Sequence, residues 1–200
     1  MRQFALDLQP PRVPTFDNFL AGANAEPLAA VRALADGRLA EPVVYLWGEP
    51  GCGRSHLLRA AAARGVVAAD DVESLEDDAQ VALFVRINAA REGACRVLAA
   101  GGAPPARLAL RDDLRSRLGG GLVYQLHALT DADKAEYLRA EGARRGLRLG
   151  DDVVDYLLAR ARRDLPFLEA FLAHLDRHAL EQQRRVTIPL VREALGSLEP

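Results

Sequence analysis

Cysteine and metal-ligand patterns are scarce in this sequence. It has two cysteines in 200 residues, Cys52 and Cys95, and neither has a second cysteine at metal-ligand spacing. Of its four histidines, His174 and His178 lie four positions apart on an expected helix, but no carboxylate-rich ligand set surrounds them. The sequence therefore argues against a disulfide scaffold and against a zinc site.

Other shortages exclude further classes of protein. No apolar run is long enough to cross a membrane and no signal-peptide pattern is present, so we expect a cytoplasmic protein with no membrane partner. The formal net charge of −2 gives no sign of a strongly basic nucleic-acid binder. Aromatic residues make up 6% of the chain against 50% hydrophobic residues overall, so we expect a core of small aliphatic side chains.

The stretch WGEPGCGRSHL, residues 47–57, follows an apolar run and opens a helical pattern. It fits the phosphate-loop template at every position but one, because Arg54 stands where lysine is usual. Glycines let the backbone turn tightly and aim N–H groups at phosphate oxygens, and the positive end of the next helix adds to the attraction. The alternative is a Gly/Pro turn with a surface arginine. The residues expected to bind a nucleotide are Gly48, Glu49, Pro50, Gly51, Cys52, Gly53, Arg54, Ser55 and His56.

A position for Mg²⁺ is expected beside this loop. The Ser55 hydroxyl suits the metal, and Asp70 follows a short apolar run, so its carboxylate is expected to hold Mg²⁺ through water. The alternative for Asp70 and Asp71 is a solvated turn. Only fourteen residues separate Ser55 from Asp70, which leaves no room for the additional strand and helix usual in such sheets. We therefore expect the sheet to lack one edge strand.

The order of the predicted elements indicates an α/β domain followed by a helical one. Strands are predicted over residues 43–47, 66–69, 95–100 and 122–126, with helices over 26–39, 54–64, 79–91 and 112–118. This alternation favours a mainly parallel sheet in three layers. Later helices are predicted to begin near residues 130, 151, 165 and 187. The chain is thus divided into an extended tail, residues 1–15, an α/β domain, residues 16–129, and a helical lid, residues 130–200.

The tail contains apolar residues in a segment too short to build its own core. Phe4, Leu6 and Leu8 alternate with polar neighbours after Gln3. Exposed apolar residues of this kind favour binding to a partner. The alternative, which the pattern supports equally, is an edge strand that docks on the body of the same protein.

Several motifs in combination resemble the DnaA-related AAA+ family. They are FDNF at 16–19 with Gly22 and Asn24, the loop GEPGCGRSHLL, the Asp-Asp pair, the Pro-Pro loop at 104–105 and LRSRL at 114–118. No pattern of DnaA's C-terminal helix-turn-helix domain follows the helical part. With the Gln-and-Leu peptide of the tail, the chain is similar to the Hda group, regulators that inactivate the replication initiator DnaA.

The resemblance implies a role for each motif. Gln3, Phe4, Leu6 and Leu8 would bind the sliding clamp, the β subunit of DNA polymerase III, so that DNA is reached only through the clamp. The chain's own site would carry ADP or ATP with Mg²⁺ as a further ligand. Arg117 matches the arginine finger, which would act in trans on ATP bound to DnaA. The implied function is regulatory inactivation of DnaA, which prevents re-initiation, and a homo-oligomer is a further expectation.

Departures from the family pattern predict weak hydrolysis at the chain's own site. Gly102 stands where the family usually has a polar side chain that senses the nucleotide. In the lid, Pro166 stands where a sensing arginine is expected, and Arg162 or Arg163 would have to substitute for it. No glutamate directly follows Asp70. Two alternatives stay open. One is a self-sufficient AAA+ ATPase or loader, and the other is a nucleotide-free adaptor that binds the clamp.

Overall fold

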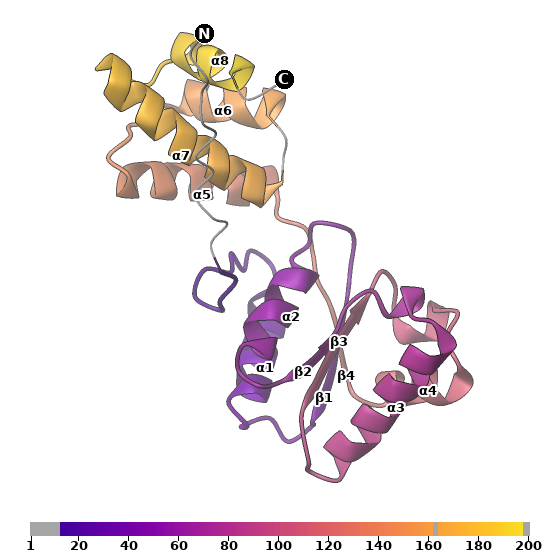
Figure 1. The fold of residues 1–200 in the computed structure, drawn as a ribbon. Helices are drawn as coiled ribbons and strands as arrows, with labels where there is room; N and C mark the ends of the chain where they lie inside the picture. Colours follow the sequence, from indigo (N-terminus) through magenta and orange to yellow (C-terminus); the bar gives the residue numbers. More distant parts are fainter. Residues whose placement is uncertain (1–12, 162–163, 198–200) are drawn as a thin grey trace, which may run out of the picture. The chain divides into compact units, whose positions relative to one another are not determined.

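The computed structural model describes residues 13–161 and 164–197. The chain divides into two compact units, an α/β unit over Pro14–Ala128 and a helical unit that begins at Leu129. Figure 1 shows the sheet and its helices in the first unit and only helices in the second. Among the described residues, no helix combines the length and apolar character needed to span a membrane.

The α/β unit is built on a parallel sheet, as the alternation of strands and helices predicts. Its four strands lie in the order β2-β3-β1-β4, and every neighbouring pair is parallel. The strands are β1 (Val43–Trp47), β2 (Val67–Ala69), β3 (Val97–Gly101) and β4 (Leu122–Gln125). Helix α2 (Arg54–Ala62) is joined to β2 by only four residues, 63–66, which leaves no room for an additional strand. The expectation of a sheet without one edge strand is therefore confirmed for the described residues.

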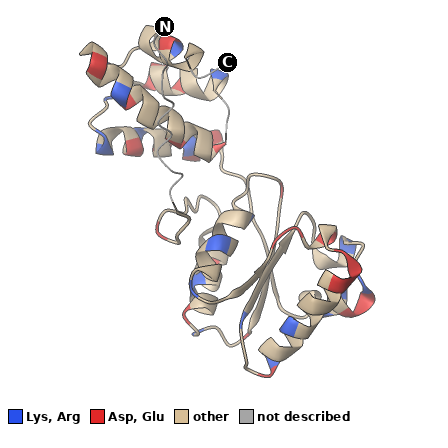
Figure 2. Cartoon of the chain, in the orientation of Figure 1, with Lys and Arg blue, Asp and Glu red and all other residues tan. Residues whose placement is uncertain are grey.

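Helices cover both faces of this sheet, which gives three layers. Alternate residues of β1 point to opposite faces, because successive side chains of a strand alternate. Val44 and Leu46 pack against α1 (Ala25–Ala35) and α2, while Val43 and Tyr45 pack against α3 (Asp77–Arg91) and α4 (Asp112–Gly119). Figure 2 shows the charged residues mainly on the helices and loops, with the central strands almost entirely free of them.

The first helix is shorter than predicted. Apolar spacing predicts helix over residues 26–39, but α1 ends at Ala35. Gly37 then adopts a φ of 75°, in the left-handed region, and the amides of Arg38 and Leu39 both donate to the carbonyl of Ala33. A glycine-dependent helix stop of this kind therefore overrides the apolar pattern that continues to Leu39.

The described part of the helical unit contains four helices around one apolar core. They are α5 (Asp131–Arg144), α6 (Asp151–Arg160), α7 (Leu165–Gln182) and α8 (Ile188–Gly196). Thr130 caps α5 by accepting from the Asp133 amide, while Asp133 accepts in return from the Thr130 amide. Asp164 caps α7 by accepting from the Phe167 amide. These caps satisfy amides that a helix leaves unpaired at its start, and the first of them lies where the sequence predicts a helix to begin, near residue 130.

Candidate functional site

The predicted phosphate loop connects β1 to α2 at the carboxyl end of the sheet. Gly51 and Gly53 have φ values of 82° and 100°, where residues with a side chain are strained. Gly53 is also the N-cap of α2, and no side chain caps this helix. The first-turn amides of a helix have no partner within it, so those of α2 are suited to phosphate oxygens. The loop geometry therefore fits the phosphates of a nucleotide.

Two of the loop glycines are also required by close packing. A Cβ at Gly48 would lie 2.3 Å from the Leu126 carbonyl oxygen, and one at Gly53 would lie 2.6 Å from the Phe19 ring. Cys52 is buried between these glycines, and burial raises the pKa of its thiol above the usual value. Cys52 therefore stays a neutral thiol that packs in the core. The backbone of the loop can approach Leu126 and Phe19 this closely only because Gly48 and Gly53 have no side chain.

The segment before α1 lies over the loop and over the start of α2. The Phe19 ring meets the His56 ring edge-on, with centroids 5.4 Å apart. His56 Nε2 lies 2.8 Å from the Thr15 carbonyl oxygen, which places the two within hydrogen-bond distance. Asn24 is buried and exchanges two hydrogen bonds with the backbone of His127. The position of His56 in the site is thus set by residues of the FDNF region, which the sequence singled out only through the family resemblance.

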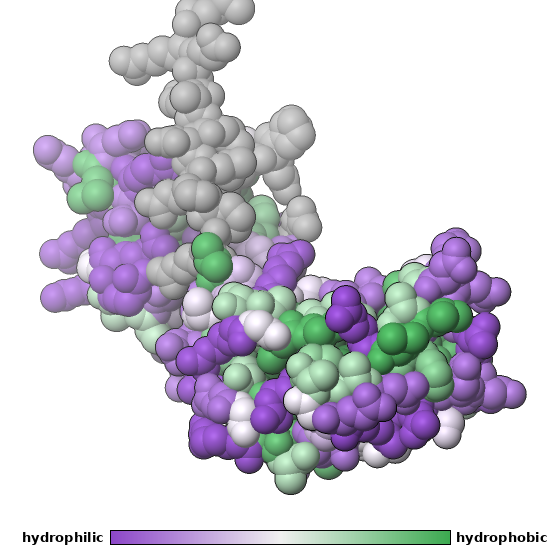
Figure 3. Space-filling view, turned by 60° about the horizontal axis from the view of Figure 1, so that its bottom comes forward, coloured by the Kyte–Doolittle hydropathy of each residue, from purple (hydrophilic) through white to green (hydrophobic). Residues whose placement is uncertain are grey.

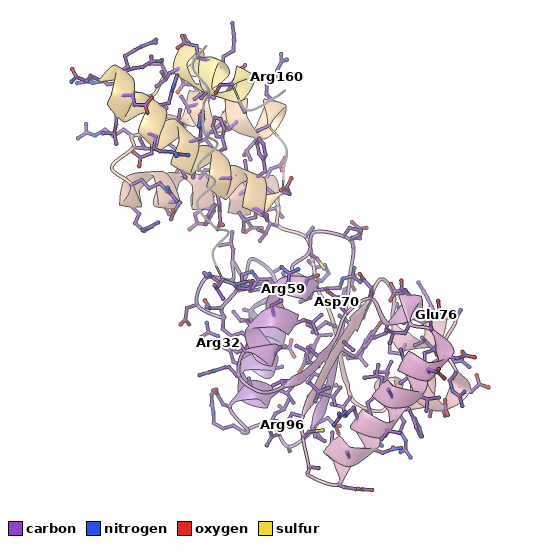
Figure 4. All side chains as sticks on the ribbon, viewed as in Figure 1. Arg32, Arg59, Asp70, Glu76, Arg96 and Arg160 are labelled. Carbon is purple, nitrogen blue, oxygen red and sulfur yellow. The ribbon has the colours of Figure 1, made fainter. Side chains whose placement is uncertain are left out.

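The two residues predicted to hold Mg²⁺ lie next to each other. The Ser55 hydroxyl donates a hydrogen bond of 2.6 Å to Asp70 Oδ2, and Figure 4 shows Asp70 near the start of α2. A hydroxyl and a carboxylate are oxygen ligands of the kind that Mg²⁺ prefers, and this ion usually takes one or two protein oxygens together with substrate phosphates. The pair therefore fits an ion that arrives with a nucleotide. Groups of three or more His, Cys, Asp or Glu at metal-binding distance are absent from the described part of the chain.

Arg54 turns toward the carboxylates that follow β2. Its Nη2 lies 3.3 Å from Asp71 Oδ1, and its side chain is 13% exposed. Asp71 adopts a φ of 43°, which is uncommon for a residue with a side chain. The loop's cation is therefore paired with the carboxylate next to the predicted metal ligand.

Glu73 and Gly102 form a contact that the sequence did not predict. Glu73 Oε1 accepts a hydrogen bond of 2.7 Å from the Gly102 amide. The buried Tyr45 lies in the same region and donates to the Ala103 carbonyl at 2.9 Å. Burial, and then the charge of Glu73, raise the pKa of Tyr45, so this hydroxyl stays protonated. The position where a polar sensor is usual thus has a carboxylate supplied from another segment.

Arg117 lies away from the phosphate loop of its own chain. It belongs to α4, which packs with α3 on the face of the sheet opposite α1 and α2. Its guanidinium carbon lies 6.0 Å from the centroid of the Phe84 ring on α3, and the residue is half-buried. Arg91 donates to its carbonyl oxygen at 3.4 Å. The structure therefore brings together the loop residues, Ser55 and Asp70, but not Arg117.

Some predicted residues lie outside the part of the chain that the structure describes. These are Gln3, Phe4, Leu6 and Leu8 of the tail, and Arg162 and Arg163 before α7. Pro166, at the predicted sensor position of the lid, lies in the first turn of α7, a position that suits proline.

Comparison with known proteins agrees with this architecture. Residues 131–195 match the family described as Hda, lid domain. Domain III of DnaA from Thermotoga maritima is similar to the chain with a TM-score of 0.71 and 18% identity, over 96% of this chain and 99% of that one. AMPPCP-bound DnaA from Aquifex aeolicus matches with a TM-score of 0.65 and 21% identity, over 80% of this chain and 64% of that one.

A branch-migration motor has a similar fold. RuvB from Thermotoga maritima matches with a TM-score of 0.65 and 16% identity, over 92% of this chain and 72% of that one. At such identities the structural likeness establishes the fold alone, which is the AAA+ fold that these proteins share. The helical unit therefore matches the Hda lid domain, in a chain that has the fold of DnaA domain III.

Proposed function

We propose that this protein inactivates the replication initiator DnaA by stimulating hydrolysis of the ATP that DnaA carries. The observation that carries the proposal is the position of Arg117, on the face of the sheet opposite α2, the helix that the chain's own loop begins. An arginine finger acting in trans must be presented to a neighbouring subunit, where it stabilises charge that develops on the γ-phosphate. The Hda lid match is the reason for choosing DnaA as that neighbour.

An apolar strip beside Arg117 suits contact with such a neighbour. Val81 and Val85 lie one turn apart on α3 and are 42% and 57% exposed, with Phe84 between them. Figure 3 shows apolar surface, in green, next to hydrophilic residues on the α/β unit. Exposed apolar side chains next to an arginine resemble the composition of protein interfaces, in which arginine and aromatic residues are enriched.

The chain's own nucleotide is proposed to have a structural role. AMPPCP is bound by the Aquifex aeolicus DnaA of similar fold, and the loop glycines and the start of α2 in this chain suit the phosphates of a nucleotide. ADP or ATP would be held by residues 48–56, and Ser55 and Asp70 would hold its Mg²⁺, whose positive charge would offset that of the phosphates. Asp71 follows Asp70, at the position where the family has a glutamate, and it is paired with Arg54. We therefore expect the chain's own hydrolysis to be slow.

The direct test is ATP hydrolysis by DnaA with the sliding clamp loaded on DNA, measured with and without this protein at neutral pH and physiological salt. We expect hydrolysis to be stimulated only when DnaA, the DNA-loaded clamp and this protein are all present. Reactions without DnaA report any turnover at the chain's own site. Fast turnover in those reactions would favour the self-sufficient ATPase, and an unchanged DnaA rate in the full reaction would refute the proposed function.

The tail is proposed to bind the clamp and so to raise the local concentration of the protein near DnaA. A double variant, Leu6→Ala with Leu8→Ala, removes two apolar anchors. The concentration needed for half-maximal stimulation should rise about 100-fold, the scale of gain that a tether provides. The matched control is Gln9→Ala, in the same tail but outside the proposed peptide. A double variant as potent as the control would rule out tethering and leave the role of Arg117 untouched.

A further inference from the structure

Arg117 is contacted at two points by helix α3. The ring of Phe84 lies 6.0 Å from its guanidinium carbon, and Arg91 Nη2 donates to its carbonyl oxygen at 3.4 Å. Phe84 and Arg91 are two helical turns apart, so they lie on the same face of α3. The side chain and the backbone of Arg117 are therefore each contacted from the neighbouring helix.

Arg117 lies at the end of a short helix that glycines terminate. Helix α4 has eight residues, with Arg117 in its last turn, and positions 119–121 are all glycine. Glycine leaves the backbone more conformational freedom than any other residue. Leu114 and Leu118 are fully buried and anchor the inner face of α4. A further contact at this end of the helix would therefore help to decide where the guanidinium of Arg117 points.

Arg91 supplies such a contact. The last carbonyl groups of a helix have no partner within it. The carbonyls on either side of Arg117 accept from backbone amides that follow the helix, whereas that of Arg117 accepts from Arg91. Gly120 makes room for this contact, because a Cβ there would lie 3.0 Å from Arg91 Nη2. Arg91 is also the last residue of α3, so its charge lies at the negative ends of two helices, where a cation is favourable.

We propose that Arg91 is a positioning residue for the arginine finger, because it fixes the backbone from which the Arg117 side chain leaves α4. The inference rests on the proposed function and adds a residue on which the rate depends without contact to the nucleotide of DnaA. A finger stabilises charge only when its guanidinium is held at the right place, and a displacement of about 1 Å can cost about 100-fold in rate. Loss of Arg91 should therefore slow the chemical step and leave the binding of DnaA unchanged.

The test is Arg91→Met, which keeps an unbranched apolar stem but removes the donors and the charge. Single-turnover hydrolysis of DnaA-bound ATP would be measured over a range of concentrations of this protein, with the clamp loaded on DNA. The maximal rate should fall about tenfold, while the concentration for half-maximal stimulation changes less than about twofold. Arg91→Lys keeps a charged donor and should recover about half of the rate or more.

The matched control is Arg86→Met, because Arg86 is an exposed arginine on the same helix. It should leave the maximal rate unchanged. In an Arg117→Ala background, Arg91→Met should have no further effect, since the two residues act as a unit. An unchanged maximal rate in Arg91→Met, an equal loss in Arg86→Met, or a rise in the half-maximal concentration alone would overturn the positioning role.

Hydrogen exchange tests the same contact without DnaA. In Arg91→Met the amides of residues 118–121 should exchange faster than in the wild type, while those of β1 keep their protection. Unchanged exchange at residues 118–121 would overturn the inference. Absence of stimulation by the wild type would instead refute the proposed function, and a loss in Arg117→Ala with none in Arg91→Met would refute only the role of Arg91.

Discussion

The variant Arg117→Ala is expected to lose about 10³-fold of the stimulated hydrolysis of DnaA-bound ATP, the lower range for removal of an arginine finger. The reason is electrostatic, because the guanidinium would stabilise charge only in the transition state on the neighbouring subunit. The fold should be unaffected. Arg117 is half-buried, and its contact with Phe84 is of the cation–π kind, worth about 0.5–1 kcal/mol near a surface.

The measurement is a single-turnover rate with saturating regulator and clamp-loaded DNA, accompanied by a melting curve of each variant. Arg115→Ala is the matched control, because Arg115 lies two residues away on the same helix and is engaged by Asp112 and by the Leu110 carbonyl. Arg117→Lys keeps the charge without the planar fork and should recover only part of the rate. Full stimulation by Arg117→Ala, or a selective loss in Arg115→Ala, would show that Arg117 is not the finger.

Much of the α/β unit was predictable because the sequence patterns that indicate its strands, helices and loop lie within short stretches of the chain. The run at 43–47 is apolar and glycine-rich residues follow it, so both β1 and the loop were found with the correct bounds. The short separation of Ser55 and Asp70 limited what the chain could place between them, and the sheet has four strands in the described residues. The spacing of residues along the chain was therefore sufficient to predict those parts of the fold in which one element directly follows another.

The contacts that shape the site were not predictable, because they join distant segments. Glu73 and Gly102 are 29 residues apart, and their contact depends on β2 and β3 being neighbours in the sheet. Phe19 reaches Gly53 only because the segment before α1 folds back over the loop. No periodicity marks either pair. Sequence reasoning thus found the residues that would hold a nucleotide but missed the contact of Glu73 with Gly102.

The second large effect is expected in the helical unit, where Phe171→Ala should destabilise the fold by about 3–5 kcal/mol. Phe171 is fully buried in the core of this unit and stacks on Phe167 with ring centroids 6.3 Å apart. Truncation removes the transfer free energy of the ring and leaves a cavity that neighbouring helices fill only in part. For a unit of this size the midpoint of unfolding should fall by at least about 12 °C.

Hydrogen exchange separates this effect from a general loss of stability. Amides of α7 should exchange much faster in Phe171→Ala, while those of β1 and β3 keep their protection, because they belong to a different compact unit. Leu180→Ala is the control, since Leu180 lies on the same helix but is 71% exposed, and it should cost less than about 0.5 kcal/mol. Equal costs for the two variants would mean that α7 does not bury the face that carries Phe171. Equal loss of protection in β1 would mean that the two units unfold as one, and the Hda lid match would then describe part of a single cooperative domain.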